Sequence, residues 1–114
     1  MEFAKVTIGE KSYLIRGDSH GTTIPADIFA EMKRHRGILE FHSHPFNDDC
    51  APSLADRALI RELRSAVGQR TSMIVTPNGR TCTFGEHGVL EMGTVPNKIN
   101  NRSKAVYMQL FGGE

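Results

Sequence analysis

The feature that most constrains this chain is a strand-like run that ends in two histidines and is followed, after a short polar loop, by a helical run. The first run, residues 38–44 (ILEFHSH), is apolar and is bounded by Gly37 and Pro45. The second run begins at Ser53 and ends at Gly68, with apolar side chains at helical spacing. We therefore expect a buried strand at residues 38–44 and a helix between Ser53 and Gly68.

Alternation along the strand at residues 38–44 predicts which side chains lie together. Successive side chains on a strand point to opposite faces of a sheet. This rule places Glu40, His42 and His44 on one face, and Leu39 and Phe41 on the other.

The flanking sequence predicts five further strands and a second helix. Residues 3–8 and 12–16 form a β-hairpin, and residues 71–76 and 81–84 flank a turn at 77–79. A further strand is expected at 89–92. Pro25 suits the first position of a helix that Gly37 closes. The apolar face of this helix comprises Ile28, Phe29 and Met32.

The order of these elements predicts an α/β (α+β) protein with a mixed β-sheet flanked by two main helices. A chain of 114 residues suits one domain. We expect that domain to span residues 1–95. Residues 96–114 form a C-terminal extension that packs on or trails the same domain, and residues 104–111 suit either a helix or a strand.

Composition narrows the classes of function. The chain is 39% hydrophobic and 24% charged with a net charge of +1, which is typical of soluble proteins and indicates neither nucleic-acid nor membrane binding. No apolar run reaches the ~20 residues that cross a bilayer, and no signal-peptide pattern opens the chain, so we expect a cytoplasmic protein. The basic cluster at residues 33–36 is interpreted as a solvated helix end.

The chain contains two cysteines, Cys50 and Cys82, which are too few for a fold built on disulfides. We expect both to be free thiols in a reducing compartment. A single disulfide that ties the histidine-rich loop to a strand is the alternative.

The two histidines and the start of the following helix together suggest a metal site. His42 and His44 point the same way about 7 Å apart, so their imidazoles can converge on one ion. Ser53 and Asp56 suit a helix cap, and Asp56 also suits a third, anionic ligand facing the strand end. Two imidazoles and one carboxylate leave an open position, which is typical of catalytic zinc. The expected reaction is hydrolysis of an amide by an activated water.

These residues resemble a known family motif. The sequence His42-Ser43-His44-Pro45, then seven residues, Ser53, two residues and Asp56, resembles the JAMM motif of the catalytic MPN+ (JAB domain) metallopeptidases, zinc isopeptidases that include deubiquitinases. The resemblance covers residues 2–92 and implies the cytidine-deaminase-like MPN/JAB fold, with the RadC-like and prokaryotic JAB branches as candidates. It implies one Zn²⁺ per chain, held by His42, His44 and Asp56, with Ser53 stabilising the oxyanion.

The family also uses an upstream glutamate as general base. The candidates before His42 are Glu2, Glu10, Glu31 and Glu40. Glu2 is favoured, because the RadC-like branch carries its glutamate at the opening of the first strand. Glu10 falls in a turn, Glu31 falls within a helix, and Glu40 lies further from the metal. Many members have a longer segment before the glutamate, so a base this near the terminus requires a well-paired first strand.

The leading hypothesis is a zinc-dependent isopeptidase or peptidase that acts on a peptide or a ubiquitin-like protein conjugate. The alternative is a RadC-like or MPN scaffold module that binds protein or nucleic acid without peptidase activity. A third option is a hydrolase of non-peptide amides. We expect no membrane partner, and nucleic acid is the less favoured macromolecule.

Overall fold

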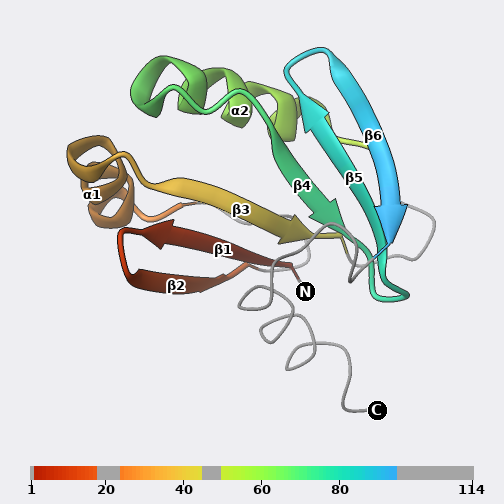
Figure 1. Ribbon diagram of the computed structural model, residues 1–114, viewed down its shortest axis with the longest axis horizontal. Coiled ribbons are helices and arrows are strands. Elements are labelled where there is room, and N and C mark those ends of the chain that lie inside the picture. Colours follow the sequence, from red (N-terminus) through yellow and green to blue (C-terminus); the bar gives the residue numbers. More distant parts are fainter. Residues whose placement is uncertain (1, 18–23, 45–49, 95–114) are drawn as a thin grey trace.

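The computed structural model describes residues 2–17, 24–44 and 50–94. Within these residues, six strands and two helices follow one another along the chain (Figure 1). They are β1 (Phe3–Ile8), β2 (Lys11–Arg16), α1 (Ala26–His35), β3 (Ile38–Ser43), α2 (Leu54–Val67), β4 (Ser72–Val75), β5 (Arg80–Gly85) and β6 (Gly88–Thr94). The strands and helices predicted in these ranges are confirmed, with small differences at their ends. The predictions for residues 96–114 lie outside the described residues.

The strands form one mixed sheet in the order β2-β1-β3-β4-β5-β6. Strands β3 and β4 are parallel, and every other neighbouring pair is antiparallel. Helix α2 makes the connection between the two parallel strands, as such a crossover requires. The prediction of a mixed sheet with two helices is therefore confirmed. The crossover also brings the start of α2 near the end of β3.

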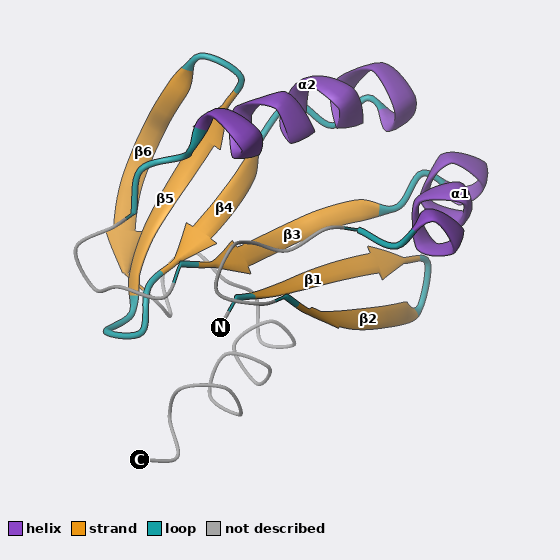
Figure 2. Cartoon of the chain, turned by 180° about the vertical axis from the view of Figure 1, so that it is seen from behind, coloured by secondary structure: helices purple, strands orange, loops and turns teal. Residues whose placement is uncertain are grey.

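Both helices pack on the same face of the sheet (Figure 2). Met32 from α1 and Ile60 and Leu63 from α2 are buried against side chains of several strands. The strand residues of this core are Ala4, Val6, Ile8, Ile15, Leu39, Ile74 and Phe84. Burial of apolar side chains is the main favourable term in folding. The core thus fixes where α2, and the side chains of its first turn, lie over the sheet.

Helix α1 begins and ends differently from the sequence prediction. Pro25 is the N-cap residue rather than the first helical residue, and Arg36 closes the helix in the left-handed conformation with φ 54°. Gly37, which follows Arg36, is therefore not the cap, but no larger residue fits at its position. A Cβ at Gly37 would lie 2.8 Å from Cγ1 of Ile8 and 2.9 Å from Cγ of Met32. This glycine therefore allows the chain to enter β3 in close contact with β1 and α1.

A bulge in β3 corrects the predicted alternation of side chains. Ala4 pairs with His42 and Lys5 with Phe41, but Val6 pairs with Leu39, so Glu40 is an extra residue on β3. Because a bulge shifts the alternation by one residue, Leu39 shares the core face with His42 instead of opposing it. The placement of Leu39 opposite the histidines was therefore wrong.

Candidate metal centre

The two histidines lie at the end of β3, on the face that carries the helices. His42 is within the strand and His44 follows it, where the backbone N–H of His44 donates to the carbonyl of Val75 at 3.0 Å. Both side chains are buried, at 6% and 7% exposure. The ring of His42 also meets the ring of Phe84 edge-on, with centroids 5.7 Å apart. Packing on the core thus limits the orientations that the His42 imidazole can take.

The first turn of α2 supplies the facing carboxylate. Ser53 is the N-cap residue: its Oγ accepts from the backbone N–H of Asp56 at 3.0 Å, and its own backbone N–H donates to Oδ2 of Asp56 at 2.9 Å. This is the capping box that the sequence suggested. The cap holds the Asp56 side chain against the helix start, so its direction is fixed before any ligand binds.

The rest of α2 is anchored to the turn between β5 and β6. Nε of Arg57 donates to the carbonyl of Glu86 at 2.8 Å, and Arg64 forms an ion pair with the Glu86 carboxylate at 3.1 Å. Because Arg57 is the neighbour of Asp56, this anchor also limits the rotation of the helix that carries the carboxylate.

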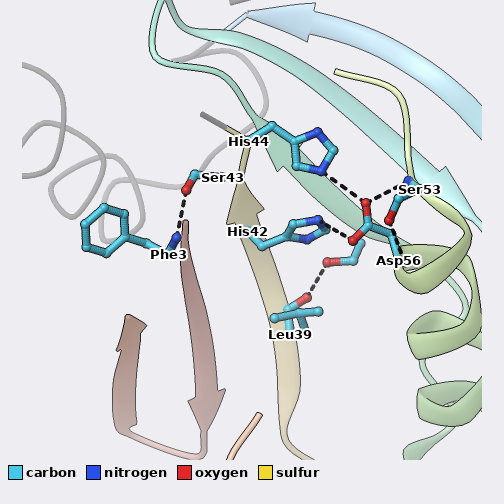
Figure 3. Close-up of polar contacts among 8 residues, drawn as sticks. Phe3, Leu39, His42, Ser43, His44, Ser53 and Asp56 are labelled. Atoms are coloured by element: carbon cyan, nitrogen blue, oxygen red, sulfur yellow. Dashed lines mark hydrogen bonds and ion pairs between the residues drawn. The ribbon is translucent and has the colours of Figure 1, made fainter. Parts of the chain in front are cut away.

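Asp56 contacts both histidines (Figure 3). Its Oδ1 lies 3.1 Å from Nε2 of His42, and its Oδ2 lies 3.0 Å from Nε2 of His44. The cap and the candidate ligand are therefore the same side chain. The structure brings together the three residues that the sequence analysis selected as metal ligands.

The donor set fits a metal ion. Two ligand atoms about 2.0 to 2.1 Å from a tetrahedral ion lie roughly 3.3 Å apart, close to the observed N–O separations. The contact of His42 with Asp56 lacks the alignment of a hydrogen bond, and both ring nitrogens of His42 are buried with no hydrogen-bond partner in the described part of the chain. Buried polar atoms are costly without a partner. A cation between these side chains would satisfy Nε2 of His42.

Glu2 lies beside the same two histidines. One ligand atom each from Glu2, His42 and His44 falls within 4.8 Å of the other two, so these three side chains alone could hold a metal ion. Glu2 precedes β1, which pairs with β3 along most of its length. Because β1 and β3 are antiparallel neighbours, Glu2 lies next to the histidine pair although it precedes His42 by forty positions in the sequence.

The two carboxylates have opposite pKa shifts. Burial raises the pKa of Asp56, but its contacts with His42 and His44 and the N–H of Ser53 outweigh burial and hold that pKa well below its usual range. Burial also raises the pKa of Glu2, and the opposing influence of His44 and His42 does not cancel it, so the pKa of Glu2 stays above the usual range. Opposite pKa shifts of two neighbouring carboxyl groups are typical of sites in which one carboxylate stays ionised and the other exchanges a proton.

The other candidate glutamates lie elsewhere. The carboxylate of Glu40, the bulge residue of β3, pairs with buried Lys5 at 2.8 Å. Glu31 lies on α1 and contacts Arg34 at 2.6 Å and His35 at 3.5 Å. Glu10 is exposed in the turn between β1 and β2. Among the four, only Glu2 is grouped with the histidines in the part of the chain that the structure describes.

Cys50 and Cys82 form a disulfide, so the expectation of two free thiols was wrong. Their Cα atoms are 5.8 Å apart, and both residues are buried. The bond joins the segment just before Ser53 to β5. This disulfide is the alternative that the two cysteines allowed. Their spacing along the chain does not show that Cys50 and Cys82 meet in space.

The basic cluster on α1 has local partners. Arg34 and His35 contact Glu31, and the ammonium of Lys33 lies 5.2 Å from the centroid of the Phe29 ring. These contacts agree with the interpretation of a solvated helix end.

Sequence reasoning gave no role to Ser43, the residue between the two histidines. Its Oγ accepts from the backbone N–H of Phe3 at 2.8 Å, and its side chain is fully buried. Alternation along β3 already places this hydroxyl on the face opposite the histidines. Its partner could not be found from the sequence, because that partner is a backbone group on another strand.

Comparisons with family models, curated proteins and solved structures found no match for this chain. Among the described residues, no helix is both long and apolar enough to span a membrane.

Proposed function

We propose that this chain is a zinc-dependent isopeptidase or peptidase of the JAMM (MPN/JAB) type, with the corresponding fold. The observation that carries the proposal is the convergence of Nε2 of His42, Nε2 of His44 and the Asp56 carboxylate, with N–O separations of 3.0 and 3.1 Å. The resemblance of the motif to that family adds the class of substrate: a peptide, or a ubiquitin-like protein joined through an amide bond.

In this proposal, His42, His44 and Asp56 hold one zinc ion. Two imidazoles and a carboxylate are a donor set that zinc accepts, and three protein ligands leave a position for substrate. A bound zinc ion supplies a Lewis acid that polarises the scissile carbonyl and lowers the pKa of water to about 7. The histidines must be neutral to bind, so zinc affinity falls in acid.

Glu2 holds and moves the proton. Its carboxylate accepts a proton from the attacking water and passes it to the nitrogen of the scissile amide, so that this nitrogen leaves as a neutral amine and not as an amide anion. Partial burial supports this role, because a carboxyl with a raised pKa is a stronger proton acceptor than an exposed one. Glu2 lies beside the ligands and, in this proposal, is not one of them.

Ser53 is the proposed stabiliser of the oxyanion. Its Oγ already accepts from the N–H of Asp56. A hydroxyl has one donor hydrogen and two acceptor lone pairs, so capping leaves the O–H of Ser53 available to donate. The helix start adds a positive partial charge at the same place. A developing negative charge on the substrate oxygen is stabilised by such a preorganised donor.

Measurement of bound zinc distinguishes the proposed ligands, such as His42 and Asp56, from the proposed base, Glu2. We expect one zinc per chain after reconstitution, loss of zinc in His42→Ala and Asp56→Ala, and retention of zinc in Glu2→Gln. His87→Ala is the matched control, since His87 is 88% exposed. Absence of stoichiometric zinc in the parent protein contradicts the proposal, whereas loss of zinc in Glu2→Gln would make Glu2 a ligand.

Activity is measured on a peptide whose C-terminal glycine is joined to a lysine ε-amino group, beside the same peptide in linear form. Glu2→Gln should lower kcat by about 10²- to 10⁴-fold, the range for loss of a general base. Full activity in this variant contradicts the assignment of the base.

The scaffold alternative stays a prediction. No contact among the described residues favours it, and in the basic cluster Arg34 pairs with Glu31 and Lys33 lies over the ring of Phe29.

A further inference from the structure

The peptide group between Glu2 and Phe3 is held from both sides. The carbonyl of Glu2 accepts from the backbone N–H of Gly17 at 2.7 Å, and the N–H of Phe3 donates to Oγ of Ser43 at 2.8 Å. The two groups belong to one planar unit, because the peptide bond does not rotate freely. Hydrogen bonds to Gly17, which follows β2, and to Ser43 on β3 therefore fix the position and the tilt of this plane, which ends at the Cα of Glu2.

Ser43 provides the only side chain in this arrangement. It lies between His42 and His44, and its hydroxyl points away from them toward Phe3 (Figure 3). The histidine side chains meet Asp56 on the other side of β3. One three-residue segment thus contacts both the candidate ligand from α2 and the backbone that carries Glu2.

Glu2 lies just outside β1, which begins at Phe3, and this makes the contact important. Backbone beyond the end of a strand is well ordered only where further hydrogen bonds or packing hold it. A glutamate acting as general base must stay within about 2.6 to 3.2 Å of the proton that it accepts. A displacement of about 1 Å can cost roughly 10²-fold in rate. A fixed Cα leaves only the side-chain torsions of Glu2 to be ordered.

We propose that Ser43 is a positioning residue for Glu2: its hydroxyl holds the Glu2–Phe3 peptide and thereby keeps the Glu2 carboxylate beside His42 and His44. Ser43 touches neither substrate nor metal in this role. The inference rests on the proposed function of Glu2 as the base, and it adds the contact that holds the backbone beside that base.

The first measurement is made on the metal-free protein and does not depend on activity. Amide hydrogen exchange of Phe3 is followed by NMR in the parent, in Ser43→Ala and in Ser43→Thr. Loss of a buried hydrogen bond worth about 1 kcal/mol should accelerate exchange by roughly 5- to 10-fold in Ser43→Ala. Ser43→Thr keeps the hydroxyl and should restore protection. Unchanged exchange in Ser43→Ala overturns the inference.

Ser72→Ala is the matched control. Ser72 is also buried, and its hydroxyl donates to the carbonyl of Leu39 on the same strand β3 at 2.8 Å. This substitution also removes a hydrogen bond between a buried serine hydroxyl and the backbone, here with the hydroxyl as donor, at the opposite end of β3 from Ser43, so Phe3 exchange and kcat should stay at parent values. Equal effects of Ser72→Ala and Ser43→Ala on Phe3 exchange would show general loosening of the sheet and would overturn the inference.

The second measurement separates positioning from binding. With zinc restored, Ser43→Ala should lower kcat by roughly 10- to 100-fold with little change in KM and in zinc content. Glu2→Gln should lose kcat while Phe3 exchange stays at the parent rate. Faster Phe3 exchange with unchanged kcat in Ser43→Ala overturns the inference alone. A parent protein that binds no zinc and cleaves no amide overturns the proposed function, and with it the role given to Glu2.

Discussion

Ser53 and Asp56 are joined by two reciprocal hydrogen bonds, of 3.0 Å from the Asp56 N–H to Ser53 Oγ and 2.9 Å from the Ser53 N–H to Asp56 Oδ2. The same Oδ2 lies 3.0 Å from Nε2 of His44. The cap of α2 and the candidate metal site therefore share one carboxylate. Structural and functional interpretations of the Ser-x-x-Asp pattern are compatible, because the carboxylate has enough lone pairs for both.

Replacement of Ser53 should affect stability and rate together. Ser53→Ala should lower the free energy of unfolding by about 1 kcal/mol, since the Asp56 N–H loses its acceptor. It should also lower kcat by roughly 10²-fold if its O–H stabilises the oxyanion. Urea unfolding and steady-state kinetics measure the two effects. Ser65→Ala, at an exposed position within α2, is the control and should lose neither.

The low pKa of Asp56 predicts acid sensitivity of the metal-free protein. Because the folded-state pKa lies below the unfolded value of about 3.9, the unfolded chain binds the proton more readily. The stability contributed by ionised Asp56 is present above that value and is lost as pH falls below it. Urea unfolding between about pH 6 and pH 3 should show this decline, and Asp56→Asn should reduce it. A decline of the same size in Asp56→Asn would contradict the assignment, and Asp27→Asn, at an exposed position, serves as the control.

The raised pKa of Glu2 has the opposite effect on how stability depends on pH. Its folded-state value lies above the unfolded value of about 4.3, so folding favours the protonated form. The stability linked to protonated Glu2 is present below that value and is lost as pH rises through the folded pKa. NMR titration of the Glu2 carboxyl carbon in the metal-free protein should give a higher midpoint than in a short peptide of the same N-terminal sequence. An equal or lower midpoint would count against burial of this side chain.

The disulfide should contribute substantially to stability. Cys50 and Cys82 are separated by 32 positions, and closing a loop of that length restricts the unfolded chain by about 3 to 4 kcal/mol. The double variant Cys50→Ala, Cys82→Ala should lose about this much in urea unfolding. Adding reductant to the parent should produce a similar loss and should leave the double variant unchanged. A loss below about 1 kcal/mol would show that the two cysteines do not restrain the chain.

Much of the fold could be predicted because its signals are local. Helix α2 was predicted between its actual caps, Ser53 and Gly68, since capping and periodicity act within a few residues. The face of β3 on which Leu39 lies was predicted incorrectly, because the bulge at Glu40 depends on the pairing of β3 with β1. The pairing of Cys50 with Cys82 was only the alternative expectation, since partners far apart in sequence leave no local pattern.

The sequence by itself determined the chemistry that this chain can offer: two imidazoles on one side of a strand end, and an aspartate in the first turn of the next helix. Only the tertiary structure decided that these groups meet, and that Glu2 rather than Glu40 lies with the histidines. The physical reason is that residue identity and short-range periodicity are properties of the chain alone. Proximity across forty residues depends on which strands pair, and β1 pairs with β3 through long-range packing.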